Sequence, residues 1–180
     1  YANDYSDGVK GSDNNRIGPT RLVASGLATA GQVKRAAFIS FAIASIAGLW
    51  LSLLSSPWLI LVGIAAIAAA WGYTGGKNPY GYSGWGEVSV FVFFGLTATV
   101  GTYYTQTGEV TALSVLCAVP MGSLACAILV INNIRDRAQD ELVGKKTTAV
   151  RIGDSKARKA LVALLAIAHL SALATMLPQS

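Results

Sequence analysis

Apolar residues in this chain are collected into long runs rather than spread along helix stripes. Runs without Asp, Glu, Lys or Arg are Ala37–Ser55, Trp58–Tyr73, Val88–Tyr104, Val110–Ile131 and Ala160–Leu177. A helix needs roughly 17–25 residues to cross a bilayer, and Trp58–Tyr73 is slightly short of that range. Helices of a soluble bundle carry charges on their outer face, and these runs do not. The pattern therefore predicts an all-α, polytopic transmembrane helix bundle with five spans in this chain.

Composition agrees with a membrane protein. Of 180 residues, 53% are hydrophobic and only 13% are charged, and the mean hydropathy is +0.49. The chain opens on a polar segment without the charged and apolar regions of a secretory signal. It ends just past the last apolar run. We expect residues 1–180 to be a single transmembrane domain, present in part, as an internal piece of a longer protein.

The basic residues are all on one side of the predicted membrane. All 14 Lys and Arg residues fall within 1–36, 74–87 and 132–159, and none falls in the two short connections on the other side. The positive-inside rule makes these three loops cytoplasmic, so we expect them to form a cap on that face. The net charge of +5 suits either a rim beside anionic lipids or a funnel for an anionic substrate, and it requires no nucleic acid.

Acidic residues form two clusters that share this cytoplasmic side. The first cluster is Asp4, Asp7 and Asp13. The second is Asp136, Asp140 and Glu141, with Asn133 one turn before Asp136. Four predicted spans separate the clusters, and an even number of crossings returns the chain to the side from which it started. Spacings of three and four residues place side chains on one helix face. The two clusters are therefore predicted to face a common mouth.

Carboxylates stacked in this way repel one another and favour a bound cation. Ligand sets made only of oxygen select hard cations, and Mg²⁺ is typically held by one or two carboxylates plus phosphate oxygens of a substrate. Two facing clusters are thus expected to hold Mg²⁺ ions around a diphosphate, with Arg16, Arg21, Lys145 and Lys146 neutralising further charge. The simpler interpretation of an Asn-Asp pair at a helix end is a cap.

Lys145 is a separate candidate within the second cluster. It follows Gly144, which can turn the chain so that the lysine reaches back over the metal site and donates to the leaving diphosphate. The alternative is that Lys145 is a solvated residue on the basic rim.

The two acidic segments resemble the aspartate-rich motifs of the UbiA-type intramembrane aromatic prenyltransferases. These segments read NDYSDGVKGSD (Asn3–Asp13) and NNIRDRAQDELVGKKT (Asn132–Thr147). Within that superfamily the chain is similar to the 1,4-dihydroxy-2-naphthoate polyprenyltransferases of menaquinone synthesis, with further support from Arg16–Arg21, Gly75–Glu87 and Ala149–Gly153. Asn133 stands where many relatives have Asp, and Asp13 follows Asp7 by six residues rather than four.

The resemblance implies a nine-helix bundle, of which the five spans here are helices three to seven. It implies an enzyme of the bacterial plasma membrane that moves a prenyl chain from a polyprenyl diphosphate to 1,4-dihydroxy-2-naphthoate, with loss of diphosphate and CO₂. Mg²⁺ would be held by Asp4, Asp7, Asp13, Asp136 and Asp140. Catalysis would use Asp4, Asp7, Asp136, Asp140 and Lys145, and substrate contacts would come from Asn3, Arg16, Arg21, Asn133, Tyr80 and Tyr82.

Other interpretations remain open from the sequence. Tyr80 and Tyr82 could roof the pocket for the aromatic acid acceptor or belong to an interfacial aromatic belt. The acceptor could be another quinone precursor, such as that of ubiquinone. Asp4-Tyr5-Ser6-Asp7-Gly8 also matches the opening of the motif of membrane CDP-alcohol phosphotransferases, but Gly11-Ser12 replaces the Ala-Arg that should follow. A cation-coupled transporter would place its carboxylates near the membrane midplane rather than at span ends.

Overall fold

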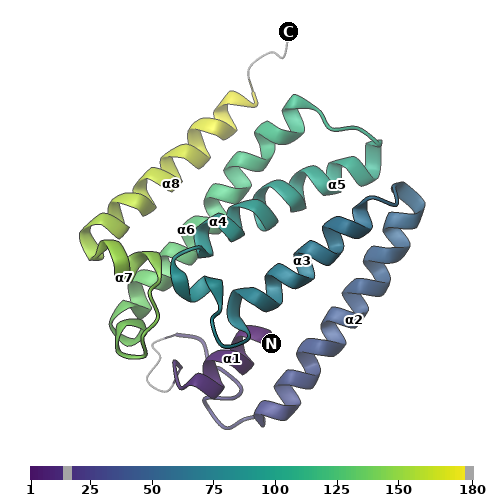
Figure 1. Ribbon diagram of the computed structural model, residues 1–180. Coiled ribbons are helices and arrows are strands. Elements are labelled where there is room, and N and C mark those ends of the chain that lie inside the picture. The colour runs from purple at the N-terminus through teal and green to yellow at the C-terminus, as the bar shows by residue number, and fades with distance from the viewer. Residues whose placement is uncertain (14–17, 177–180) are drawn as a thin grey trace.

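The computed structural model describes residues 1–13 and 18–176 and forms a bundle of slanted helices (Figure 1). Every regular element within these two ranges is helical, which confirms the predicted all-α class. In chain order the elements are α1 (Ala2–Lys10), α2 (Ala30–Ser55), α3 (Leu59–Thr74), the 3₁₀ turn η1 (Tyr80–Ser83), α4 (Gly86–Val90), the π-helical segment η2 (Phe91–Thr97), α5 (Ala98–Thr107), α6 (Ala112–Leu142), α7 (Thr148–Ile152) and α8 (Asp154–Ala174).

Helices long and apolar enough to cross a membrane correspond to four of the five predicted spans. They are α2, the continuous helix from Gly86 to Thr107, α6 and α8. The fifth span corresponds to α3, an apolar helix of 16 residues. At 1.5 Å per residue it rises about 24 Å, somewhat less than the roughly 30 Å of a hydrocarbon core. The chain is that of a multi-pass membrane protein.

Two helices extend well beyond the apolar runs that predicted them. α2 begins at Ala30 rather than Ala37, because Thr29 and Gln32 form a capping box in which the Gln32 side chain accepts from the Thr29 N–H at 2.8 Å. α6 continues from Ile131 to Leu142, so the expected loop 132–159 is helical over its first third. Apolar runs mark the part of a helix that lies in hydrocarbon, whereas backbone hydrogen bonding continues into the polar region. The predicted span ends are therefore not helix ends.

The long helix α6 packs against α8, α7 and the helix from Gly86 to Thr107. Its backbone comes close to that of η2 where Gly122 faces Gly95, since a Cβ placed on Gly95 would lie 2.5 Å from Gly122 Cα. Small residues allow membrane helices to approach this closely. Pro120 lies inside α6 near the same crossing. This contact fixes how α6 presents its polar C-terminal part.

The polar connections gather at one end of the bundle. Figure 1 shows α1, α7 and the C-terminal end of α6 at the same end, and α1 packs against α2 and α3. The turn η1 packs against α3 and α4. The first and second acidic clusters, separated by more than 120 residues, are thus carried to one end of the bundle, as the count of spans predicted.

Candidate active site

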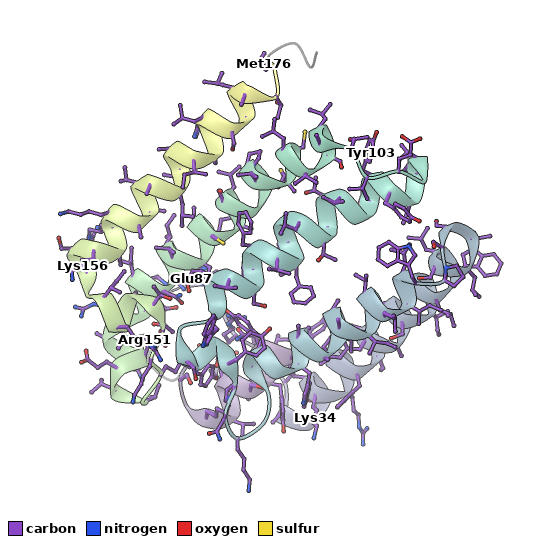
Figure 2. The ribbon with its side chains drawn as sticks, turned by 45° about the horizontal axis from the view of Figure 1, so that its top comes forward. Lys34, Glu87, Tyr103, Arg151, Lys156 and Met176 are labelled. Carbon is purple, nitrogen blue, oxygen red and sulfur yellow. The ribbon has the colours of Figure 1, made fainter. Side chains whose placement is uncertain are left out.

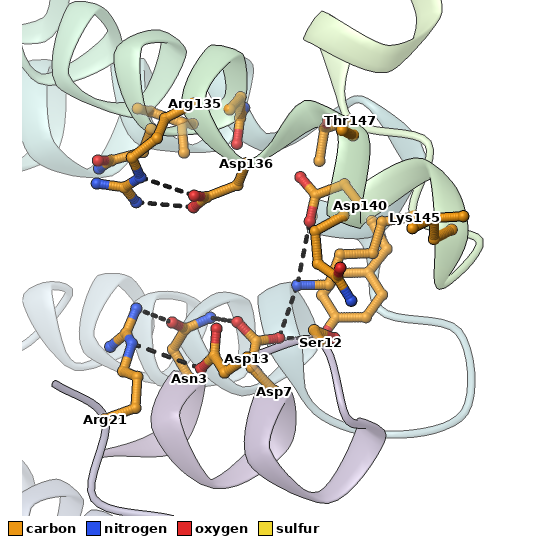
Figure 3. Close-up of a pocket in the computed structure, with 18 of the residues that line it drawn as sticks. Asn3, Asp7, Ser12, Asp13, Arg21, Arg135, Asp136, Asp140, Lys145 and Thr147 are labelled. Carbon is orange, nitrogen blue, oxygen red and sulfur yellow. Dashed lines mark hydrogen bonds and ion pairs between the residues drawn. The ribbon is translucent and has the colours of Figure 1, made fainter. Parts of the chain in front are cut away.

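A polar pocket of about 340 Å³ lies between α1, η1, the end of α6 and the segment that follows it. In Figure 3, Arg135 and Asp136 lie on one side of this pocket and face Arg21, Asn3 and Asp7 on the other. Lining residues include Asn3, Asp7, Ser12, Asp13, Arg21, Tyr73, Tyr82, Asn133, Arg135, Asp136, Asp140, Lys145 and Thr147. The structure therefore brings both motifs into a single pocket.

Asp7 is the most heavily bonded carboxylate of α1. It is buried, and it accepts from Asn3 Nδ2 at 3.1 Å, from Lys145 Nζ at 2.9 Å and from the hydroxyl of Tyr82. Asn3 also accepts from Arg21 Nη2 at 2.9 Å. These bonds link three parts of the chain that are far apart in sequence. Asp7 therefore lies at the centre of the pocket's hydrogen-bond network.

Asp13 reaches the pocket because α1 ends in a glycine. Gly11 has a φ of +74°, a left-handed conformation that glycine adopts without strain, and it turns the chain after α1. Ser12 and Asp13 are both buried and line the pocket. Arg21 approaches Asp13 at 3.6 Å. The six-residue spacing between Asp7 and Asp13 is thus compatible with a shared pocket.

Asp4 has a different environment from the other acidic residues. Its two carboxylate oxygens accept backbone N–H groups of Leu22, at 2.9 Å, and Val23, at 3.1 Å. It is buried, and it is not among the residues that line the pocket. The structure therefore does not bring Asp4 together with Asp7, Asp136 and Asp140, although the sequence grouped them. Its bonds anchor the segment that carries Arg21.

The second motif presents its polar residues along one face of α6. Asn133, Asp136 and Asp140 all line the pocket at the predicted helical spacing. Asp136 accepts two bonds from the guanidinium of Arg135, both at 2.7 Å, and Asp140 is buried. Arg135 is a pocket residue that the sequence did not single out. Its position directly before Asp136, on the face of a helix that carries the motif, was the available signal.

The ammonium of Lys145 lies between the carboxylates of Asp7 and Asp140. Gly144 has a φ of +76° and turns the chain after α6, and the ammonium of Lys145 then lies 2.9 Å from Asp7 and 3.7 Å from Asp140. The residue is only 8% exposed. Lys146 is exposed instead, and its N–H donates to the carbonyl of Tyr82 at 2.8 Å. The lysine that was predicted to reach back into the site does so.

The two tyrosines of η1 separate into different environments. Tyr82 lines the polar pocket, where the ammonium groups of Lys10 and Lys145 each lie 4.4 Å from its ring. Burial and the hydrogen bond to Asp7 raise the pKa of its phenol, so the hydroxyl stays protonated and donates. Burial lowers the pKa of Lys10. Tyr80 points elsewhere and bonds the carbonyl of Ala69 at 2.8 Å.

Apolar cavities adjoin the polar pocket and extend into the bundle. One of about 650 Å³ shares Asn3 and Tyr73 with the polar pocket and is lined by apolar residues of α2, α3 and the helix from Gly86, together with Tyr80. Another of about 550 Å³ lies further along and shares Ala66, Thr97 and Ala98 with it. The series leads from charged side chains at the end of the bundle to apolar surface between membrane helices.

The pocket's donors suit a hard cation that also binds a ligand. Within the described ranges, no three His, Cys, Asp or Glu side chains are grouped so that they alone could hold a metal ion. Mg²⁺ does not require three, since it commonly uses one or two carboxylates and completes its shell with water and phosphate oxygens. Among the described atoms the buried hydroxyl of Thr147 has no hydrogen-bond partner, although it lines the pocket. A ligand oxygen would satisfy it.

Three further residues differ from, or lie beyond, what the sequence predicted for the pocket. Arg16, expected to contact substrate, lies outside the described residues. Ser12 and Thr147 line the pocket without having been selected, because a lone hydroxyl beside a motif carries no pattern of its own. The nearest signal for Thr147 was its position two residues after Lys145.

The chain is similar to known proteins along most of its length. The chain is 52% identical over 177 residues to the 1,4-dihydroxy-2-naphthoate octaprenyltransferase of Mycobacterium tuberculosis, covering 98% of this chain and 61% of the relative. It is 43% identical to the enzyme of that name from Haemophilus influenzae, covering 97% and 59%. It is 42% identical to that of Escherichia coli, covering 91% and 56%. The chain thus spans about 60% of the length of these relatives.

No solved structure matched the chain. The family comparison matched the UbiA prenyltransferase family over residues 1–179, which includes both acidic motifs and every helix described above. A match of this extent does not depend on either motif alone. The chain therefore belongs to the UbiA prenyltransferase family.

Proposed function

We propose that the protein transfers a prenyl chain from a polyprenyl diphosphate to 1,4-dihydroxy-2-naphthoate, with release of diphosphate and CO₂. The observation that supports this proposal is that a pocket of carboxylates and cations adjoins an apolar cavity between membrane helices, with Asn3 and Tyr73 lining both. A prenyl diphosphate has the same two parts, an anionic head and a long apolar chain. The names of the similar proteins support the naphthoate acceptor and the octaprenyl class of donor.

In this proposal Asp7, Asp13, Asp136 and Asp140 hold Mg²⁺, with Asn133 offering an amide oxygen. Bound Mg²⁺ would neutralise negative charge on the diphosphate as the carbon–oxygen bond breaks. Lys145 moves from Asp7 and Asp140 onto the leaving oxygens and stabilises the charge that develops there. Arg21 and Arg135 provide further donors on opposite sides of the pocket.

The apolar cavities bind the prenyl chain and keep water away from the allylic cation. Tyr82 lines the pocket beside the ammonium groups of Lys10 and Lys145, and its hydroxyl and ring face the reacting end of the donor. Loss of CO₂ from the ring carbon that has been alkylated then restores the aromatic acceptor. We further propose that the pocket opens on the cytoplasmic side of a bacterial plasma membrane, as the distribution of lysine and arginine favours.

The test uses the protein at the full length that its gene encodes, purified in detergent. Incubation with octaprenyl diphosphate, Mg²⁺ and 1,4-dihydroxy-2-naphthoate should release diphosphate and CO₂ in equal amounts, and EDTA should stop both. The same assay with 4-hydroxybenzoate, a ubiquinone precursor, and with a CDP-alcohol separates the alternatives. Turnover with either of these and not with the naphthoate would reject the proposed acceptor.

A further inference from the structure

A carboxylate outside the pocket contacts one of its polar residues. Glu87 lies in the first turn of α4 (Figure 2). One carboxylate oxygen accepts from Asn133 Nδ2 of α6 at 3.1 Å, and the other accepts from Thr148 Oγ1 of α7 at 2.5 Å. The backbone carbonyl of the same residue lies 3.1 Å from the thiol of Cys126. Glu87 therefore joins the start of one membrane helix to Asn133 of the second motif and to α7, which follows that motif.

The chemistry of the Glu87–Asn133 contact fixes the orientation of the amide. An ionised carboxylate only accepts hydrogen bonds, and an amide donates only through its nitrogen. Asn133 must therefore turn its Nδ2 toward Glu87, which leaves its Oδ1 directed away from Glu87. Because Asn133 lines the polar pocket, the atom that it offers there is the oxygen. An amide oxygen is a ligand for Mg²⁺, whereas the NH₂ group would repel it.

We propose that Glu87 is a positioning residue that locks the Asn133 amide with its oxygen toward the metal–diphosphate pocket. This inference rests on the proposed function, because the lock matters only if a cation binds there. It gives a physical reason for a neutral Asn at this position of the motif. An Asp at position 133 would place a second carboxylate about 3 Å from Glu87, where the two negative charges repel.

Glu87→Ala tests directly whether the bond from Asn133 to Glu87 orients the amide. Removing the carboxylate frees the amide to rotate, and loss of such an outer partner typically weakens metal binding by about 10–100-fold. The measurement is the melting temperature of the full-length protein in detergent with an unreactive thiolodiphosphate analogue of the donor, titrated with Mg²⁺. The Mg²⁺ midpoint is the Mg²⁺ concentration that produces half of the full rise in melting temperature. In Glu87→Ala this midpoint should be about 10-fold higher or more. This readout is independent of turnover.

Adding Asn133→Asp to Glu87→Ala separates orientation from a purely structural role. A carboxylate has two equivalent oxygens and requires no partner to orient it, so the double variant should bring the Mg²⁺ midpoint back toward that of the unchanged protein. Thr148→Val, which removes the other donor to Glu87, should leave the midpoint unchanged. If Glu87 only fastens helices, Asn133→Asp would restore nothing and Thr148→Val would resemble Glu87→Ala.

Glu87→Gln serves if the alanine variant does not fold. Glutamine can hold Asn133 in either orientation, so the Mg²⁺ midpoint of Glu87→Gln should rise by less than that of Glu87→Ala. Adding Asn133→Asp should again lower the midpoint, because the introduced glutamine can donate to the new carboxylate. A Glu87→Ala midpoint equal to that of the unchanged protein, with Asp7→Asn abolishing the Mg²⁺ effect, would overturn this inference alone. Absence of any Mg²⁺-dependent stabilisation in the unchanged protein would instead overturn the proposed function.

Discussion

At the scale of single residues, the pocket gives each of its carboxylates a basic partner. Asp7 and Asp140 share the Lys145 ammonium, Asp136 binds Arg135, and Asp13 pairs with Arg21. A buried ionised group without such a partner would cost several kcal/mol. Lys145 therefore acts as the resident cation of the two central carboxylates. A metal ion bound by them would release the lysine for contact with a substrate.

Lys145→Ala should lower kcat by about 10²-fold or more, a loss typical of one donor that stabilises charge in the transition state. KM for the donor should change much less, because the contact strengthens as the bond breaks. Lys146→Ala is the matched control: that side chain is exposed, and kcat should change by less than about threefold. Steady-state kinetics of both variants in detergent measure kcat and KM, and melting temperatures check that both variants are folded. Small and equal decreases in kcat for both variants would show that Lys145 is a solvated residue of the basic rim.

Asp4 and Asp7, three residues apart on α1, should respond differently to the same change. Asp4→Asn replaces one oxygen that accepts a backbone N–H by an NH₂ group, so it should destabilise the fold by about 1–3 kcal/mol. It should leave substantial turnover. Asp7→Asn should abolish turnover in protein that still folds, because an amide binds Mg²⁺ weakly. Its melting temperature should fall as well, because the new NH₂ group cannot accept a bond and Lys145 loses a charged partner. Loss of turnover at full stability in Asp4→Asn would show that Asp4 also serves the chemistry.

At the scale of elements, the site depends on how α6 is held. Its polar end carries Asn133, Asp136 and Asp140, and its middle contacts η2 through two glycines that approach backbone to backbone. A π-helical segment inserts an extra residue into a turn and locally changes which side chains face a neighbour. The Gly95–Gly122 contact therefore sets the position of the second motif relative to the helix that begins at Gly86.

Gly95→Ala should displace α6, because its Cβ would lie 2.5 Å from Gly122 Cα and a backbone atom cannot swing aside. Overpacking of this kind costs about 1–3 kcal/mol. Gly101→Ala on α5 is the control, because a Cβ at that position meets nothing within 4 Å, and alanine favours helix over glycine by about 1 kcal/mol. Thermal unfolding in one detergent should show a lower melting temperature for Gly95→Ala only. Equal melting temperatures would mean that the two helices separate without cost.

At the scale of the whole molecule, the fold closes one end of a membrane bundle with charged side chains and leaves an apolar interior behind it. The motifs meet because an even number of helices lies between them and because α1 packs against α2 and α3 on the same end as α7. The arrangement separates a polar site for a diphosphate from an apolar site for its chain. It also predicts which connections face the same side of the membrane.

Single cysteines at Lys77 and Gln106 should be labelled from opposite sides of the membrane. Both positions are exposed, and the helix from Gly86 to Thr107 lies between them. Lys77 belongs to a basic connection and should be cytoplasmic. The background should have Cys117 and Cys126 replaced, and an impermeant thiol reagent applied to inverted and right-side-out vesicles supplies the measurement. Labelling of both positions from one side would refute the topology.

The sequence by itself determined the class of fold and the location of the charges. Runs without charge predicted the membrane helices because the cost of placing a charge in hydrocarbon is a property of each segment alone. Lysine and arginine counts predicted which connections lie together, and helical spacing predicted that Asn133, Asp136 and Asp140 share a face. The turn at Gly144 was also predictable, because only local backbone conformation is involved.

Tertiary structure alone decided which partner each polar group chose. Asp4 and Asp7 have the same side chain on one helix, yet one anchors the backbone at Leu22 and Val23 and the other binds Lys145. Tyr80 and Tyr82 likewise face different cavities, and Glu87 reaches Asn133 across 46 positions of sequence. Hydrogen bonds form between groups that packing brings within about 3 Å. That distance is set by how helices cross, and no local pattern in the chain encodes it.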